Sequence, residues 1–168
     1  MKQFFGKYRG LVMENIDPLQ IGRLLVQVTD PSNILPSSWA MPCFPFTGIQ
    51  NGFFVVPAIG SGVWVEFEHG DLDKPIWTGG FFGSAAEVPA LALAAPPGLQ
   101  TIVLQTLLQN TLMISDAPGP TGGILLKTTL GAFIAVNELG IQISNGQGAT
   151  ILMTGPTVTV NEGALEVI

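Results

Sequence analysis

The sequence has little charge and almost no cysteine. Only 11% of its 168 residues are charged, the six basic residues are scattered, and the formal net charge is −6. Phosphate binding requires clustered Lys and Arg, so a nucleic-acid partner is not expected. The single cysteine, Cys43, excludes an intrachain disulfide framework and a cysteine-based metal cluster.

Long uninterrupted apolar runs are also missing. The most apolar window, residues 88–108, contains Pro89, Pro96 and Pro97 and would make a poor transmembrane helix. The N-terminal segment MKQFFGKYRG has no apolar core of the kind that signal peptides carry. We therefore expect a protein that is cytoplasmic when it is made.

Glycine, proline and apolar residues are plentiful instead. The chain has 21 Gly, 13 Pro and 47% hydrophobic residues, which is the reverse of a disordered composition. Low charge combined with many turn formers predicts an all-β chain. The length allows one large domain or two small ones.

Residues 111–168 form a series of short β-type runs separated by Gly, Asn or Asp. From Gly131 onwards, glycines at positions 140, 148, 155 and 163 recur every seven to nine residues. Within the runs the side chains alternate, so that Ile141 and Ile143 share one face and Gln142 takes the other. Short strands at regular spacing predict a β repeat array with one apolar face.

This array cannot cover its own apolar face. Its only charged residues are Asp116, Lys127, Glu138, Glu162 and Glu166. Each repeat buries surface only against a neighbour, and open strand edges invite pairing with another chain. We predict that this half is obligately oligomeric, with interchain main-chain hydrogen bonds running through it. A monomeric sandwich or solenoid is the alternative.

The N-terminal half is predicted to contain about five strands. The clearest runs are residues 8–15, 21–29, 53–56, 62–69 and 76–82. Residues 39–46 contain two prolines and are expected at a sheet edge. Alternation directs inward Leu24, Val26, Val28, Val63, Val65 and Phe67. Five strands without a helix signal indicate a small closed or partly closed barrel.

A change in composition separates the two halves. Residues 84–98, SAAEVPALALAAPPG, are rich in Ala and Pro, and the prolines prevent a continuous helix. We interpret residues 1–83 as one domain, 84–98 as a semi-rigid linker and 99–168 as a second domain. The β-branched start of residues 101–108 favours a strand there.

Motifs in both halves resemble a known family. The first half contains KYRGLV, then IGRLLVQV, then PAIGSGVWVEFEHGDLDKPIWTG; the second contains NTLMISDAPGPTGGILLKTTLGAFIAVN. These sequences resemble phage baseplate assembly protein V and the related VgrG-like central spike proteins of contractile injection systems. The GDLDKP turn that follows VWVEFE is the most specific element.

The resemblance implies an N-terminal OB-fold barrel followed by a C-terminal intertwined trimeric β-helix, or β-prism. It implies a homotrimer that docks on a baseplate hub protein and pierces a target-cell envelope when the sheath contracts. Some phage spikes end in a His-x-His iron site, but the only histidine here is His69, so we expect no metal and no other cofactor. A separate PAAR-type tip protein at the C-terminal end is implied instead.

The alternation of the last strands assigns the core of the trimer. Apolar residues that share the inward face are Ile141, Ile143, Ile151, Met153, Val158 and Val160. Low charge suits this role, because charged side chains directed at a shared axis would be costly to bury.

Few residues suggest catalysis. His69 lies near Ser61, Glu68 and Asp71 in the sequence, so a triad or a metal site could be assembled, but a solvated turn is the ordinary outcome. Glu66 and Glu68 could form a carboxylate pair, but their alternation with Val65 and Phe67 favours a solvated strand face. We expect no enzymatic activity, with a small all-β hydrolase using His69 as a rival interpretation.

A binding module is the other rival. Trp39, Trp64 and Trp77 could form a platform for sugars or bases. OB barrels that grip single strands interleave aromatic and basic residues on one face, and this half has few basic residues. The preferred interpretation is therefore a structural spike, and the alternative is an OB-fold binding module for nucleic acid or glycan.

Overall fold

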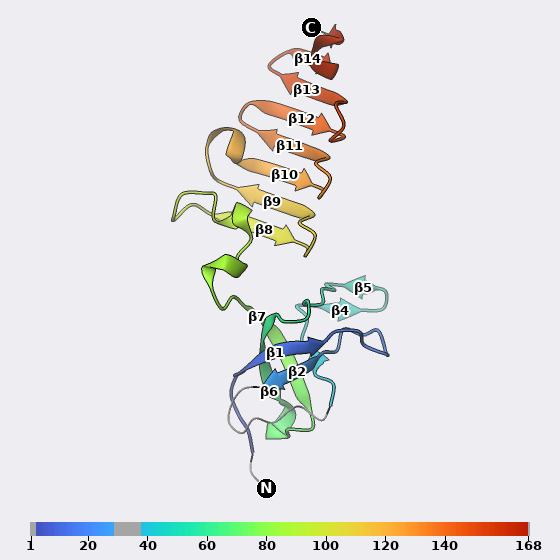
Figure 1. The fold of residues 1–168 in the computed structure, drawn as a ribbon, viewed down its shortest axis with the longest axis vertical. Coiled ribbons are helices and arrows are strands. Elements are labelled where there is room, and N and C mark those ends of the chain that lie inside the picture. The colour runs from blue at the N-terminus through green and yellow to red at the C-terminus, as the bar shows by residue number, and fades with distance from the viewer. Residues whose placement is uncertain (1–2, 29–37, 168) are drawn as a thin grey trace. The chain divides into compact units, whose positions relative to one another are not determined.

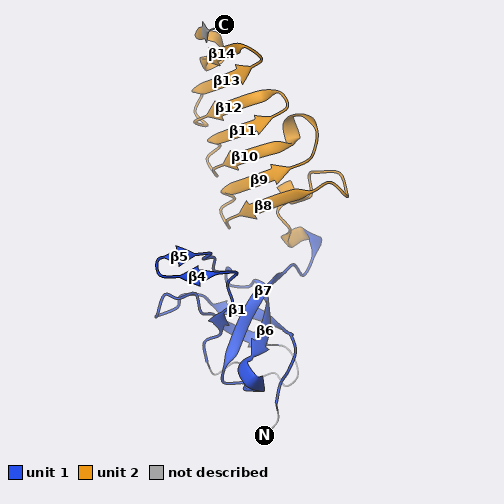
Figure 2. Cartoon of the chain, turned by 180° about the vertical axis from the view of Figure 1, so that it is seen from behind, with its two compact units in different colours: residues 1–85 blue, residues 86–168 orange. Residues whose placement is uncertain are grey.

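The computed structural model describes residues 3–28 and 38–167, which form two compact units. Residues 1–85 make up the first unit and residues 86–168 the second (Figure 2). The described residues contain β-strands and short 3-10 turns but no α-helix, so the all-β prediction is confirmed. No helix in the described ranges has the length and apolar character needed to cross a membrane.

The first unit contains a five-stranded sheet. Its strands are β1 (Tyr8–Glu14), β2 (Leu25–Val28), β3 (Met41–Pro42), β6 (Gly62–Phe67) and β7 (Pro75–Phe81). They pair in the order β2-β1-β6-β7-β3, and only the β3–β7 pair is parallel. Leu24 and Ala40 exchange two backbone hydrogen bonds, of 3.1 and 2.8 Å, next to β2 and β3. This exchange joins the two ends of the sheet and closes it into a barrel.

Side chains at alternating strand positions fill the inside of this barrel. Every second residue of β6 is buried, and the same holds for β2. The buried positions include all six residues that the sequence directs inward: Leu24, Val26, Val28, Val63, Val65 and Phe67. Phe4, Val12, Ala40 and Trp77 complete this core. The predicted barrel interior is confirmed.

The predicted strand at residues 53–56 is wrong. The structure places a small hairpin just before it, with β4 (Thr47–Gly48) and β5 (Asn51–Gly52) joined by a turn at Ile49 and Gln50. Gln50 in this turn adopts the left-handed conformation, with φ of +53°, and the Asn51-Gly52 pair lies in β5 and not in the turn. The Phe53 N–H donates to the Phe46 carbonyl at 3.1 Å, but residues 53–56 belong to no strand, and Phe53, Phe54 and Val55 are exposed.

The second unit is one antiparallel sheet whose eight strands pair in chain order (Figure 1). The strands are β8 (Thr101–Gln105), β9 (Thr111–Ser115), β10 (Gly123–Lys127), β11 (Phe133–Asn137), β12 (Gly140–Ser144), β13 (Thr150–Thr154), β14 (Thr157–Val160) and β15 (Leu165–Val167). Two 3-10 turns precede them, η2 (Ala85–Glu87) and η3 (Ala90–Ala92). The strand expected at residues 101–108 is present but ends at Gln105, where a turn begins.

Close approach of the backbones requires glycine at one of these strand starts. Gly140 has φ of +138°, and a Cβ atom there would collide with the carbonyl oxygen of Met153 on β13. A side chain at this position would therefore be strained in its backbone and would separate β12 from β13.

A buried ion pair holds the segment between β1 and β2. Arg23 Nη2 lies 2.7 Å from Asp17 Oδ1, and the side chain of Asp17 is only 3% exposed. The same carboxylate accepts hydrogen bonds from the backbone N–H groups of Leu19, Ile21 and Arg23. The Arg23 guanidinium also stacks over the ring of Trp39. Neither charge is left without a partner, as burial requires.

This arrangement changes the titration of Asp17. The Arg23 guanidinium holds the pKa of the Asp17 carboxyl well below its ordinary value; burial opposes this effect, and the backbone N–H groups reinforce it. The unfolded carboxyl titrates at about 3.9. Since the folded pKa is the lower one, the ion pair contributes fully above about pH 4 to 5, and its contribution is lost as the pH falls toward the folded pKa.

Asp17→Asn is expected to destabilise the barrel and to weaken its acid sensitivity. The variant leaves Arg23 buried without a counter-charge at neutral pH and removes a group whose protonation drives acid unfolding. All three tryptophans lie in residues 1–85, so their fluorescence follows the unfolding of this unit. Between about pH 7 and pH 3, the melting temperature should fall further in the natural protein than in Asp17→Asn.

Glu66→Gln is the matched control. Glu66 pairs with Lys7 at 2.7 Å, but both side chains are exposed. Such a pair contributes about 0–1 kcal/mol, so the control should melt close to the natural protein at pH 7. Equal melting temperatures for Asp17→Asn and Glu66→Gln at that pH would show that the buried pair does not stabilise the barrel.

Candidate oligomer interface

Two rows of aliphatic side chains run along one face of the β8–β15 sheet. Directly opposed residues of antiparallel strands share a face, so the strand register assigns the rows. One row contains Ile102, Ile114, Ile124, Val136, Ile141, Met153 and Val158; the other contains Leu104, Leu112, Leu126, Ile134, Ile143, Ile151, Val160 and Leu165. We call this surface the aliphatic face. Within the described strands, no polar residue interrupts either row.

The aliphatic face is open in the single chain. Ile102 is 60% exposed and Leu104 is 54% exposed, and Ile134 in the middle of the sheet is still 41% exposed. Contiguous apolar patches on soluble proteins rarely exceed a few hundred Å² unless they bind something. The aliphatic face therefore has the properties of a protein–protein interface.

The other face of the sheet is mixed in character, and we call it the mixed face. Its middle row contains Val103, Met113, Leu125, Ala135, Gln142, Leu152 and Thr159. On β9 this face is already covered, since Thr111, Met113 and Ser115 are all buried while Ile114 on the aliphatic face is 44% exposed. The chain thus covers part of its mixed face and leaves its aliphatic face bare.

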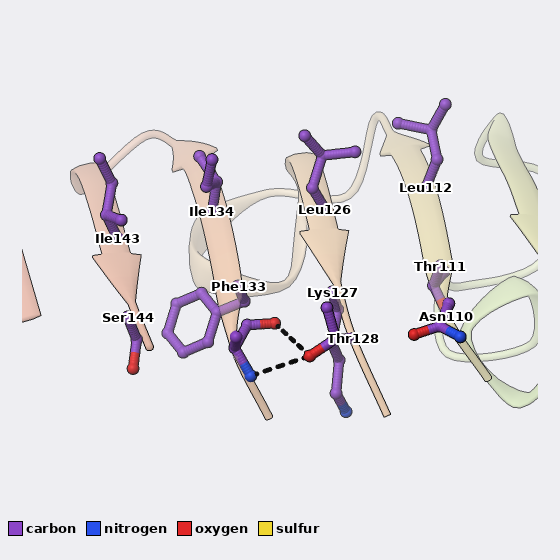
Figure 3. A pocket seen from close by; sticks show the side chains of 11 residues that line it. Asn110, Thr111, Leu112, Leu126, Lys127, Thr128, Phe133, Ile134, Ile143 and Ser144 are labelled. Atoms are coloured by element: carbon purple, nitrogen blue, oxygen red, sulfur yellow. Dashed lines mark hydrogen bonds between the residues drawn. The ribbon is translucent and has the colours of Figure 1, made fainter. Parts of the chain in front are cut away.

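A hollow of about 620 Å³ lies beside the ends of β9 to β12. Figure 3 shows that Leu112, Leu126, Ile134 and Ile143 point to one side of the sheet, whereas Lys127, Phe133 and Ser144 point to the other. Small-molecule sites combine an apolar lining with a few convergent polar groups. Here the polar groups point away from the aliphatic side chains, so the hollow fits a surface covered by protein better than a ligand site.

The main-chain hydrogen bonds of the sheet are made within one chain. Strands β9 to β14 each pair with a strand on both sides, and only the two outermost strands have a free edge. This differs from the expectation that interchain main-chain hydrogen bonds run through the array. The physical reason is the short turns, which return the chain at once to pair with its own preceding strand.

The structure brings the six residues assigned to the trimer core onto one surface. Ile141, Ile143, Ile151, Met153, Val158 and Val160 all lie on the aliphatic face. Sequence reasoning missed the remainder of that face on β8 to β11. The signal was present, because TIVLQ, TLMIS, GILLK and FIAVN show the same alternation.

The residues considered for catalysis are not assembled into a site. His69 lies in the exposed turn η1 (Glu68–Gly70), and Ser61 lies at the opposite end of β6, about 20 Å of extended chain away. Glu66 is engaged by Lys7. Within residues 3–28 and 38–167, no group of three or more His, Cys, Asp or Glu side chains could hold a metal ion.

The three tryptophans do not form a common platform. Trp77 is buried in the core and donates a hydrogen bond from Nε1 to the carbonyl oxygen of Gly22 at 3.0 Å. Trp64 packs against Phe81, and the guanidinium of Arg9 lies over both rings. Their aromatic surfaces are used for packing within the barrel.

Comparison with protein families assigns each unit separately. Residues 8–82 match the model of the type VI secretion system/phage-baseplate injector OB domain. Residues 101–166 match the model of the phage baseplate V C-terminal trimerisation domain. The second match spans the strands that carry the aliphatic face. No curated protein matches the chain.

Ile143→Asp is expected to abolish the soluble oligomer. The variant places a carboxylate on the aliphatic face of every copy, where burying it without a partner costs several kcal/mol. Thr159→Asp is the matched control, because this residue of β14 lies on the mixed face, between Val158 and Val160 of the aliphatic face. Size-exclusion chromatography with light scattering should show loss of the oligomer for Ile143→Asp alone. An intact oligomer carrying Ile143→Asp would remove this residue from the interface.

Proposed function

Because the chain belongs to the phage baseplate V family of spike proteins, we propose that three copies form the central spike of a contractile tail or injection system. The two matched domains are structural parts of baseplates and injectors. In this proposal the spike docks on a baseplate hub through its barrels and pierces a target-cell envelope. The protein is made in the cytoplasm and becomes part of the assembled particle.

The observation that carries the proposal is the uninterrupted aliphatic face. It lies within the residues that match a trimerisation domain, and a single chain leaves it open. Burying a Leu, Ile or Val side chain fully contributes about 1.5–3 kcal/mol relative to leaving it in water. Side chains in two rows along the sheet would make a continuous apolar core once other copies cover them.

The strand length suits a prism of three sheets. A strand of five residues is about 16 Å long, and the centre of an equilateral triangle with that side lies about 5 Å from each wall. Two packed sheets are about 10 Å apart, so 5 Å is the depth that one layer of side chains fills. Three such walls would enclose a packed axis without a channel. Each wall would be the sheet of one chain, in place of an intertwined β-helix.

The mechanism proposed is mechanical. Within each wall, backbone hydrogen bonds each contribute about 1 kcal/mol net, and they join all strands in series from β8 to β15. Side chains on the axis hold the three walls together. An object built in this way resists load along its length, because deforming it requires the loss of many contacts at once.

Exposed apolar residues on the barrel support docking on a hub. Ile49 at the tip of the β4–β5 hairpin is 97% exposed, and Phe46 and Phe54 beside it are 60% and 65% exposed. Residues 31–65 contain no charged residue. A two-stranded hairpin with apolar side chains in water is marginally stable alone, so contact with another protein would suit it.

A separate tip protein is proposed at the C-terminal end. Strand β15 pairs with β14 on one side only, which leaves a row of backbone donors and acceptors on its other side. Such an edge is a template for binding another protein. A PAAR-type tip protein is the partner that the family resemblance implies for this position.

The oligomeric state tests the proposal. The natural protein should have a native mass of three times 17.7 kDa, and part of it should resist SDS in the cold and dissociate on heating. Native mass spectrometry and gels of unheated and heated samples measure both. The Ile143→Asp variant is the control and should run at the monomer mass under all conditions.

A clean monomer of the natural protein would contradict the spike. It would mean that the aliphatic face is covered in another way, and it would favour the OB-fold binding module. A dimer that resists cold SDS would keep the interface but exclude the three-walled prism.

A further inference from the structure

The turns of the second unit alternate between the two edges of the sheet. Residues 106–110, 128–132, 145–149 and 161–164 lie at what we call the first edge; residues 116–122, 138–139 and 155–156 lie at the second edge (Figure 1). Strands are about 4.8 Å apart, so turns on one edge are about 10 Å apart. Each first-edge turn is therefore level with the gap between two second-edge turns.

Leu130 projects from the first edge on an ordered turn. Its side chain is 88% exposed. The turn that carries it is closed by a hydrogen bond of 2.8 Å from the Thr128 N–H to the Ala132 carbonyl. Thr129 N–H also donates to Asn110 Oδ1 of the preceding first-edge turn, at 3.1 Å. The exposed leucine is thus held at a defined position by its backbone.

A second hollow, of about 870 Å³, extends across the mixed face from Lys127 and Gly131 near the first edge to Leu139 at the second edge. Its apolar lining includes Pro120, Leu125, Phe133, Ala135, Leu139 and Leu152. Leu139 is 60% exposed and Leu152 is 40% exposed. Gly119 N–H donates to Glu138 Oε2 at 2.8 Å, which ties the two second-edge turns beside the hollow together. The single chain therefore has an exposed apolar side chain at one edge and an unfilled, largely apolar groove that reaches the other edge.

Threefold symmetry relates these two features, if the proposed trimer is the assembly. A closed threefold ring is built from heterologous contacts, in which one patch of each copy meets a different patch of the next. A threefold axis rotates the copies without shifting them along the axis, so a given strand lies at the same height in all three copies. Leu130 lies between β10 and β11, and the hollow includes Leu125 of β10 and Ala135 of β11. Leu130 is therefore level with the middle of the groove, and Leu139, in the turn between β11 and β12, lies one strand spacing, about 5 Å, further along.

The orientation of the walls also matches. When the aliphatic faces point to the axis, the mixed faces point outward. At each corner of a triangular prism, a turn that extends beyond the end of one wall passes over the outer face of the next wall. The five-residue turn at residues 128–132 is longer than the two-residue turn at residues 138–139, whereas the neighbouring second-edge turn at residues 116–122 has seven residues. Beside the short turn at residues 138–139, the first edge therefore overlaps the mixed face of the next copy.

We propose that Leu130 of each copy inserts into the mixed-face hollow of the next copy, beside its Leu139. This corner contact rests on the proposed trimeric spike and adds to it the specific surface that joins neighbouring walls. This contact, repeated at the three corners, would cover both the Leu130 side chain and the mixed-face hollow. Leu107 makes no such contact, because the mixed face at its level is already covered: Met113 and Ala117 are buried within their own chain.

Cysteine cross-linking of the full-length chain tests the corner contact. The double variant Leu130→Cys/Leu139→Cys is made in a Cys43→Ser background, so that no other thiol is present. Disulfides require Cα atoms about 4.4–6.8 Å apart. Mild oxidation followed by non-reducing SDS gels of heated samples should show a covalent trimer of three times 17.7 kDa. Each single variant can link two copies at most and should stay monomeric on the same gel, so that a covalent trimer of the double variant identifies the link between residues 130 and 139.

Leu107→Cys/Leu139→Cys in the same background is the matched control and should give no covalent trimer. Native mass of the unoxidised double variant is measured in parallel. A native trimer that yields no covalent trimer would overturn the corner contact and leave the spike intact. A native monomer of the natural protein would overturn both proposals.

A second comparison does not depend on introduced cysteines. Leu130→Ser and Leu107→Ser change two leucines of similar exposure, 88% and 84%. Leu130→Ser should lower the temperature at which the trimer dissociates in SDS by roughly 5 °C, whereas Leu107→Ser should leave it unchanged. Equal dissociation temperatures for the two variants would count against the insertion of Leu130.

Discussion

The structure depends on an apolar surface that one chain cannot cover. Because the aliphatic face has no polar residue along the described strands, it has to be removed from water by protein, and the sheet that carries it is built for that purpose. The strands are of nearly equal length, the turns between most of them are short, and charge is kept to the turns and the mixed face. Each of these properties keeps the two rows continuous.

Backbone and side chains have separate tasks in this unit. Hydrogen bonds from β8 to β15 are satisfied within one chain, so each sheet is internally complete. Contacts between copies would then consist of side chains on the aliphatic face and at the corners. The barrel follows the same logic more simply, because its sheet closes on itself through Leu24 and Ala40 and buries its own core.

The alternation of apolar and polar residues along the strands was enough to predict much of the barrel core and of the aliphatic face from the sequence. It identified the inward residues of β2 and β6, and it placed Ile141 and Ile143 on the same face, opposite to Gln142. It could not distinguish pairing within a chain from pairing between chains, because both give the same period of two. It also missed the hairpin at residues 47–52, because the turn residues Ile49 and Gln50 are not typical turn formers. The Asp17–Arg23 pair lies in irregular backbone, where no periodic pattern marks which polar residues meet.

The alternation of turns between two edges restricts how such a spike can change in length. Inserting a single strand would transfer every later turn to the opposite edge and reverse the direction of every later strand. Inserting a hairpin of two strands would preserve edges, directions and both aliphatic rows. Length would therefore vary in steps of two strand spacings, about 10 Å. Related spikes of different reach would differ by whole hairpins, and the cross-section that fits three walls around one axis would stay constant.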